Sequence, residues 1–205
     1  MRLQIMLQRS IIGGLILPET VDALSATECI LDTLRDASTA SGVLADADPD
    51  LAIRAPGTDT TLRAVTVLGT LDVRSLSADD SLFRGALRVH RRQTGCLRFC
   101  FVPSGSETPR RYRCQPELAL SEADPALASR VRAVVVPRFT STGPGQPGYG
   151  QLRRTTAAEI RTGAESGAEM GVFSFLYQPQ REANAREALR QYLRFGLEAG
   201  LFFET

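Results

Sequence analysis

The chain has 205 residues, of which 43% are hydrophobic and 23% are charged. These fractions are typical of a globular protein and exclude wholesale disorder. The 24 basic and 23 acidic residues nearly cancel, so the chain has no overall field that would attract nucleic acid or an anionic membrane. No run approaches the roughly 18 apolar residues of a membrane helix. We therefore expect neither membrane insertion nor general binding to nucleic acid.

The first 17 residues are mostly apolar, but Gln8, Arg9 and Ser10 interrupt them and no small-residue cleavage site follows. This pattern argues against a signal peptide and predicts a cytoplasmic protein, or one that belongs to a larger exported assembly. The four cysteines include no CxxC pair and do not form a disulfide-dense scaffold, so we expect reduced thiols.

A short apolar phrase recurs in the first half of the chain. It consists of a small polar residue, two apolar residues, a turn and a second short strand, and its copies begin at Ser10, Cys29, Thr66 and Ser81. Ile11 and Ile30 are 19 residues apart, Ile30 and Val67 are 37 apart, and Val67 and Leu82 are 15 apart. A spacing in the upper teens fits one turn of a parallel β-helix.

Alternation within these segments supports short strands with one buried face. Leu71 and Val73 flank Asp72, and Leu87 and Val89 flank Arg88, so the charged residues should face outward. We predict a mainly β fold, a short right-handed parallel β-helix (solenoid) with a C-terminal α-helical cap. An antiparallel sandwich with irregular turns is the alternative.

Breaks in the pattern suggest the domain organisation. Residues 36–61, with Pro49, Pro56 and Gly57 as breakers, are predicted to be a partly exposed turn of the β-helix with a loop. Residues 103–116 end the periodic pattern, so we assign residues 1–116 to the β-helix and residues 117–205 to an irregular and α-helical cap. Residues 180–200 have helical spacing, and this helix should cover the open end of the last turn.

Several stretches carry a family resemblance: RRQTGCLRF at 91–99, TPRRYRCQP at 108–116, PRFT at 137–140, EIRTGA at 159–164 and QPQREAN at 178–184. With them the chain resembles the C-terminal portion of an uncharacterised bacterial β-helix family that is loosely associated with gene clusters for phage-tail-like contractile particles. The resemblance implies a structural role. It supplies no catalytic residues.

Metal-ligand chemistry is concentrated in His90, Cys96, Cys100 and Cys114. A Cys₃His zinc site is conceivable, with Cys96 and Cys100 pointing the same way from one strand. However, such sites usually begin with a closer pair of cysteines, and a buried free cysteine commonly acts as a small hydrophobic residue. We favour the hydrophobic role and assign no metal, cofactor-binding or catalytic residue.

Paired carboxylates raise a second possibility, because parallel β-helices often carry polysaccharide-cleaving enzymes. Asp79 and Asp80 could serve as general acid and base, assisted by Arg84, Arg88 or His90. Residues 77–81 also look like a turn, where aspartate is ordinary turn chemistry. We favour the turn.

Other charged residues have solvated surface roles as their simplest explanation. Arginines occur in two groups that could contact an anionic partner or discourage edge-to-edge aggregation of strands, namely Arg88, Arg91 and Arg92, and Arg110, Arg111 and Arg113. Glu159, Glu165 and Glu169 lie near glycines and could bind Ca²⁺, but their spacing matches no known calcium motif.

Strand-like sequence begins at residues 3–7 with no cap ahead of it. The uncovered first turn of a β-helix would expose backbone groups and apolar side chains. We predict a protein partner or self-association through this end, with Ile5, Leu7, Ile11 and Leu15 near the contact. The sequence thus predicts a non-enzymatic structural or interaction module, with a β-helix carbohydrate-active enzyme (polysaccharide hydrolase or lyase) as the alternative.

Overall fold

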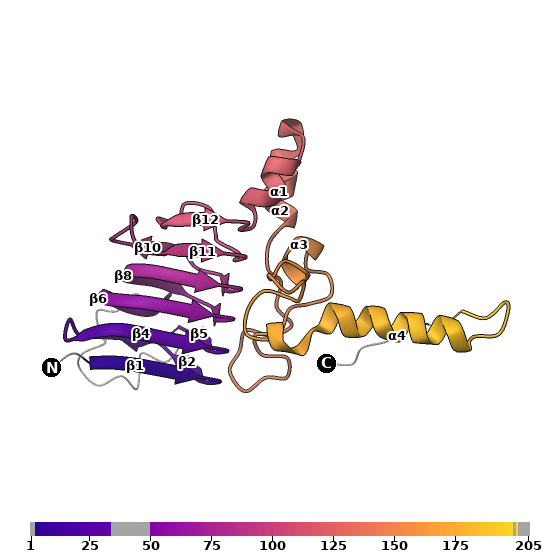
Figure 1. Ribbon diagram of the computed structural model, residues 1–205, viewed down its shortest axis with the longest axis horizontal. Helices are drawn as coiled ribbons and strands as arrows, with labels where there is room; N and C mark the ends of the chain where they lie inside the picture. Colours follow the sequence, from indigo (N-terminus) through magenta and orange to yellow (C-terminus); the bar gives the residue numbers. More distant parts are fainter. Residues whose placement is uncertain (1–2, 34–49, 199, 201–205) are drawn as a thin grey trace.

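A computed structural model of the chain describes residues 3–33, 50–198 and 200. Strands occupy the first part of the chain and helices the second (Figure 1). The fold is mixed α/β, with 35% strand and 21% helix, and its strands form parallel sheets.

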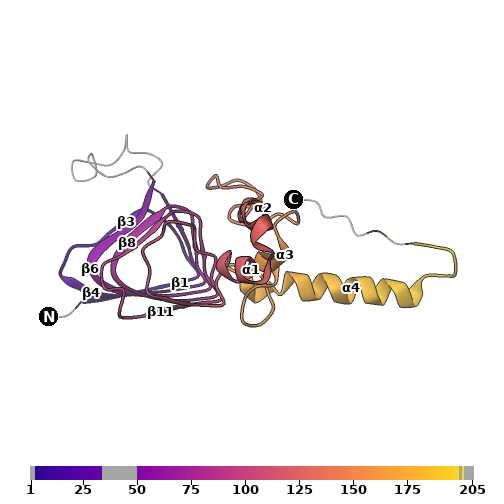
Figure 2. The same cartoon turned by 90° about the horizontal axis from the view of Figure 1, so that it is seen from above.

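The strands form two sheets, and every pair of named strands is parallel. The eight-stranded sheet contains β1 (Leu3–Gln8), β3 (Leu15–Ile16), β4 (Val21–Thr27), β6 (Leu51–Arg63), β8 (Thr70–Asp79), β10 (Leu87–Val89), β11 (Cys96–Arg98) and β12 (Arg110–Tyr112). The four-stranded sheet contains β2 (Ile11–Gly13), β5 (Ile30–Asp32), β7 (Thr66–Val67) and β9 (Leu82–Phe83). Figure 2 shows how the chain passes from one sheet to the other.

The chain turns between the two sheets at residues with left-handed backbone conformation. Six such corner residues have φ between 47° and 53°, and none is glycine: Arg9, Glu28, Ala64, Asp80, Phe99 and Arg113. This conformation is costly for a residue with a Cβ atom. The first five corner amides each donate a hydrogen bond of 3.0–3.1 Å to the carbonyl just before the next corner. This ladder of hydrogen bonds helps to offset the strain and aligns successive corners.

The main core lies between the two sheets and consists of apolar side chains, most of them aliphatic. Leu24, Leu62, Leu76 and Phe83 are among its fully buried members. The predicted alternation is confirmed in β8 and β10, where Leu71, Val73, Leu87 and Val89 are buried and Asp72 and Arg88 face outward. Leu87 pairs with Leu71 and Val89 with Val73.

The helices are α1 (Glu117–Glu122), α2 (Ala128–Val134), α3 (Ala158–Arg161) and α4 (Gln178–Tyr192), with short 3₁₀ turns at Pro125–Leu127 and Ser174–Leu176. Among them only α3 buries a side chain, that of Ile160. In Figure 1, α1 and α2 rise beside β12, and α4 projects away from the sheets. None of these helices is long and apolar enough to cross a membrane.

The irregular segments around α3 cover the outer face of the four-stranded sheet. One apolar cluster joins Leu82 and Phe101 to Val135, Ile160 and Met170. A second joins Ile30 and Leu68 to Tyr149 and Val172. Hydrogen bonds also join these irregular segments to the four-stranded sheet, along a contact that we call the seam. Tyr149 Oη donates to Asp32 Oδ2 at 2.6 Å, and the Val172 amide donates to Thr66 Oγ1 at 3.0 Å. We refer to residues 138–177 as the covering segment.

The predicted fold class, a β-helix solenoid closed by a helical cap, is wrong. The chain forms a mixed α/β fold with parallel sheets. The helix α4 does not cover the end of the strand stack: it extends away from its side, and none of its residues is buried. The physical reason is that apolar side chains such as Ile30, Leu68 and Leu82 face outward from the four-stranded sheet. The covering segment buries that face.

Candidate functional site

The structure brings two of the four predicted metal ligands together, Cys100 and Cys114, whose thiols are neighbours in the main core. The corner at Phe99 separates Cys96 from Cys100, so the two do not point the same way from one strand. Cys100 and Cys114 are buried in the main core, and burial raises the pKa of the Cys100 thiol. His90 lies outside, with Nε2 at 2.7 Å from Asp72 Oδ1. No group of three or more His, Cys, Asp and Glu residues within the described ranges could hold a metal ion.

Asp79 and Asp80, the predicted acid–base pair, both accept hydrogen bonds from other parts of the fold. Asp79 ends β8 and accepts a hydrogen bond of 2.6 Å from Arg98 Nε. Asp80 is the next corner residue, and its carboxylate accepts a hydrogen bond of 2.7 Å from the Glu165 amide. The Asp80 carbonyl also accepts one of 2.7 Å from the Gly171 amide. Asp80 therefore fastens the covering segment to the corner, and burial raises the pKa of its carboxyl group.

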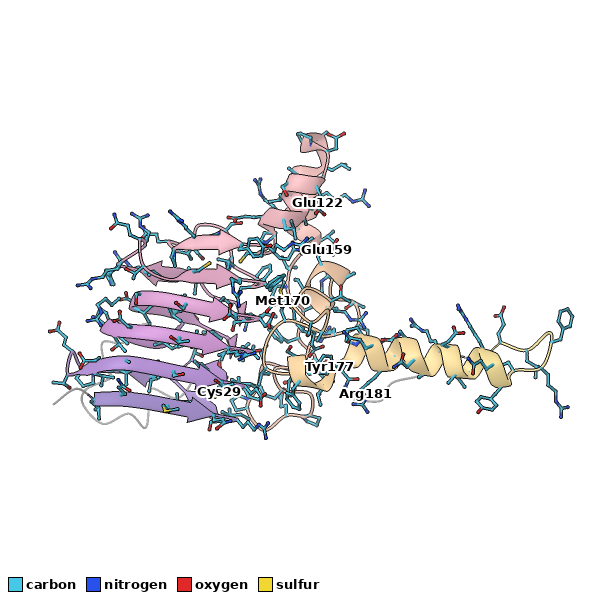
Figure 3. The ribbon with its side chains drawn as sticks, in the orientation of Figure 1. Cys29, Glu122, Glu159, Met170, Tyr177 and Arg181 are labelled. Carbon is cyan, nitrogen blue, oxygen red and sulfur yellow. The ribbon has the colours of Figure 1, made fainter. Side chains whose placement is uncertain are left out.

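The three glutamates considered for Ca²⁺ differ in their surroundings. Glu165 is exposed, 4.0 Å from Arg98, and Glu159 is exposed on α3, away from the strand ends (Figure 3). Glu169 is buried, and burial raises its pKa to about 7 although Arg161 opposes the shift. Its neighbour Met170 lies where the strand ends meet the covering segment (Figure 3). The structure does not bring the three carboxylates into one site.

A shallow groove of about 530 Å³ crosses β6, β8 and β10, and charged side chains line it. Arg54 pairs with Asp72, Asp72 with Arg88, and Arg88 with Glu107 across neighbouring strands. Charges thus alternate along the groove, as cross-strand neighbours must if they are to avoid like-charge repulsion. The sequence predicted that Asp72 and Arg88 face outward but not that they are neighbours, nor that Arg54 and Glu107 flank them, since the pairing of these strands is not visible in the sequence.

The second arginine group lies at one edge of the eight-stranded sheet. Arg110 and Arg111 belong to the edge strand β12, and Arg113 is the corner that follows it. Arg111 donates to Thr108 Oγ1 at 2.7 Å and to the Ser106 carbonyl at 3.0 Å, and it pairs with Glu117. Charged residues of this kind discourage an edge strand from pairing with another chain.

The opposite edge of the eight-stranded sheet, at β1, exposes apolar side chains where β12 has arginines. There β1 pairs only with β4, and β2 only with β5, among the strands that the structure describes. Leu3 is 49% exposed, Met6 83% and Ile11 64%. No charged residue occurs in β1 or in residues 10–17, and Arg9 between them is paired with Glu28 at 2.6 Å. We call β1 and β2 together the open edge.

The core itself reaches the open edge. Ile5 pairs with Leu24 and Leu7 with Ala26, so both continue the stacked columns of the main core. Both remain only partly buried, as do Ile12, Leu15 and Leu17, which pack against the same core. Sequence analysis placed Ile5, Leu7, Ile11 and Leu15 here. It missed Met6, which is the most exposed apolar residue of β1, because strand alternation alone does not show which face is solvated.

No protein-family model matches the chain, and no curated protein or solved structure has significant similarity to it. The resemblance to the bacterial β-helix family and its association with phage-tail-like particles therefore stay predictions.

Proposed function

We propose that this protein is a non-enzymatic structural module that assembles with protein partners by strand pairing at the open edge. An edge strand presents a row of backbone donors and acceptors that another strand can satisfy. In β1 that row runs beside exposed apolar side chains. A partner strand would thus gain hydrogen bonds and apolar contacts together.

The contrast between the two sheet edges carries this proposal. Proteins commonly protect an edge strand with charged residues, proline or a short length. Two of the three residues of β12 are arginines, whereas the six residues of β1 include no charged residue and no proline. Protection at one edge and its absence at the other are the pattern expected when one edge is kept for binding.

The size of the apolar contribution is consistent with reversible assembly. Burying a side chain of the size of Leu, Met or Ile stabilises a complex by about 1.5–3 kcal/mol. Leu3, Met6 and Ile11 are already partly covered, so together they supply several kcal/mol at most. Association costs roughly 4–15 kcal/mol in lost freedom of motion. Backbone hydrogen bonds along β1 and further burial of Ile5 and Leu7 are therefore needed as well.

The enzyme alternative receives no comparable support. Asp79 is held by Arg98, and Asp80 by the backbone of the covering segment. In the groove, Arg88 stands between Asp72 and Glu107 in the strand register. Glycosidase carboxylates instead flank the position of the scissile bond.

Light scattering coupled to size-exclusion chromatography over a concentration series tests the proposal. The native chain is expected to form assemblies larger than a monomer at high concentration. Met6→Lys should reduce them strongly, because it places a charge on the open edge. Tyr112→Lys is the matched control, since Tyr112 is a 55% exposed residue of the other edge strand. A native chain that stays monomeric throughout, or equal loss of assembly in both variants, would overturn the proposal.

A further inference from the structure

We infer that the partner at the open edge is a second copy of this chain, paired antiparallel through β1 about a two-fold axis at Met6. This inference rests on the proposed function and specifies its partner and geometry. It follows from three properties of the open edge: its charge, the direction of its strands and the alternation of its side chains.

Charge and length favour pairing of the open edge with itself. Two copies of β1 bring no like charges together, because β1 has none and the nearby Arg9 is paired with Glu28. Stacking β1 on β12 of another copy would match six residues with three, two of them arginines. That contact would also be heterologous and could continue into an open filament, whereas contact between identical edges closes as a dimer.

Strand direction selects the antiparallel arrangement. A two-fold axis normal to the eight-stranded sheet pairs β1 antiparallel with its copy and keeps the core faces of both sheets on the same side. An axis along the strands would pair them in parallel but turn the core face of one copy to the outside of the other. β1 and its neighbour β4 run in parallel toward the covering segment (Figure 1). Antiparallel pairing therefore places the two covering segments at opposite ends of the strand pair.

Side-chain alternation fixes the register. Ile5 and Leu7 face the core, while Gln4, Met6 and Gln8 are exposed. An axis centred on Met6 sets Ile5 opposite Leu7 of the second copy, so the two cores become continuous. On the outer face it sets Met6 opposite Met6, and Gln4 opposite Gln8, whose amide groups can exchange hydrogen bonds. Centring on Ile5 or Leu7 would instead place Met6 opposite a glutamine.

A charge exchange tests the axis. Met6→Lys and Met6→Glu should each raise the dissociation constant of the dimer tenfold or more, because the axis places like charges side by side. An equimolar mixture of the two variants should recover the dimer, because Lys then faces Glu. The recovered species should contain one copy of each variant, which native mass spectrometry can measure.

Cross-linking tests the register directly. In a Cys96→Ser background, Met6→Cys should form a covalent dimer with a short bis-maleimide reagent, since the two introduced thiols meet at the axis. Gln8→Cys is the matched control and should give much less product, because Gln8 faces Gln4. The remaining cysteines, Cys29, Cys100 and Cys114, are buried.

The outcomes separate this inference from the proposed function. If the native chain assembles but Met6→Cys gives no more cross-linked dimer than Gln8→Cys, or the mixed charge variants do not recover it, the two-fold geometry is wrong and the open edge can still be the binding surface. Assemblies that grow beyond the dimer with concentration would likewise indicate head-to-tail stacking. Absence of any assembly overturns both.

Discussion

Ile11 and Ile30 are the same residue type in neighbouring strands and pair directly with each other, yet one is 64% exposed and the other 3%. The difference comes from the covering segment. Tyr149, Phe139 and Phe173 pack around Ile30, and a Cβ on Gly150 would lie only 2.8 Å from Ile30 Cδ1. Among the described residues, this cover ends at β5 and does not bury Ile11 of β2. Strand pairing thus gives the two isoleucines equivalent places in one sheet, and the covering segment makes one buried and leaves the other exposed.

The largest expected effect tests this comparison at its two residues. Ile30→Ala should lower the free energy of unfolding by about 2–5 kcal/mol, because it leaves a cavity beneath the covering segment. Ile11→Ala should change it by no more than about 0.5 kcal/mol in the monomer. Urea denaturation at concentrations that keep the chain monomeric measures both. Similar losses for the two variants would show that the covering segment does not pack on Ile30 in solution.

The buried carboxyl group of Glu169 gives the covering segment a pH dependence. Its pKa rises from 4.5 to about 7 on folding, so the folded state binds the proton more tightly than the unfolded chain does. Stability is therefore lost as pH rises from about 4.5 to 7. Glu169→Gln should stabilise the protein by up to about 3 kcal/mol at pH 8, and the gain should shrink toward zero near pH 4.5.

Urea denaturation at both pH values checks this prediction, with the exposed Glu165→Gln as the control. A gain for Glu169→Gln that does not depend on pH would contradict the assigned cause.

A smaller effect is expected from the polar contact of the seam. Tyr149→Phe removes the hydrogen bond to Asp32, a buried side chain, and should cost about 1–3 kcal/mol because a buried acceptor loses a donor. Tyr112→Phe, at the exposed edge strand, should have no measurable effect. Thermal and urea unfolding of the pair measure the difference, and equal stability of both variants would show that the Tyr149 hydroxyl group contributes nothing to the seam.

The smallest effect concerns metal. We expect chelation with EDTA to leave the melting temperature unchanged, because the corner at Phe99 separates Cys96 from Cys100 and His90 lies outside the core. Metal analysis of protein purified without added zinc is the companion measurement. One tightly bound zinc ion per chain that disappears in Cys96→Ser would prove this expectation wrong.

Sequence reasoning succeeded where the signal was local. The spacing between Ile11 and Ile30 matches their observed pairing, and the outward positions of Asp72 and Arg88 followed from alternation. It failed by one residue further along, since Ile30 pairs with Thr66 and not with Val67. Spacing alone could not fix this register. Thr66 and Val67 are adjacent and similar in size, and the chain between Ile30 and this strand is long.

For the region of β6 the sequence predicted only a partly exposed turn of the β-helix with a loop, and not one strand of 13 residues. Pro56 and Gly57 indicated a loop, but the register of β6 against β8 shifts between Ala55 and Asp59. An irregularity of this kind accommodates residues that a regular strand rejects. The earlier part of this predicted segment, residues 36–49, lies outside the described ranges.

The covering segment could not be predicted from local patterns at all. Its contacts join residues far apart in the chain, such as Tyr149 and Asp32, and it has little regular structure of its own. Periodicity therefore favoured a helical cap, while the cover is made by loops and turns. At the open edge the sequence indicated a strand at residues 3–7, although not that Met6 would be its most exposed apolar residue. The predicted association through this end stays a prediction.

The ladder of corners has an evolutionary consequence. Successive corner residues are separated by 19, 36, 16, 19 and 14 residues, yet the hydrogen bonds between corners keep nearly the same length. Alignment is therefore set where the chain turns and not by the number of residues between turns. A gene encoding such a chain can gain or lose codons between two corners without shifting the strands on either side. Related sequences would then diverge in length faster than in structure, and alignments that penalise gaps uniformly would tend to overlook them.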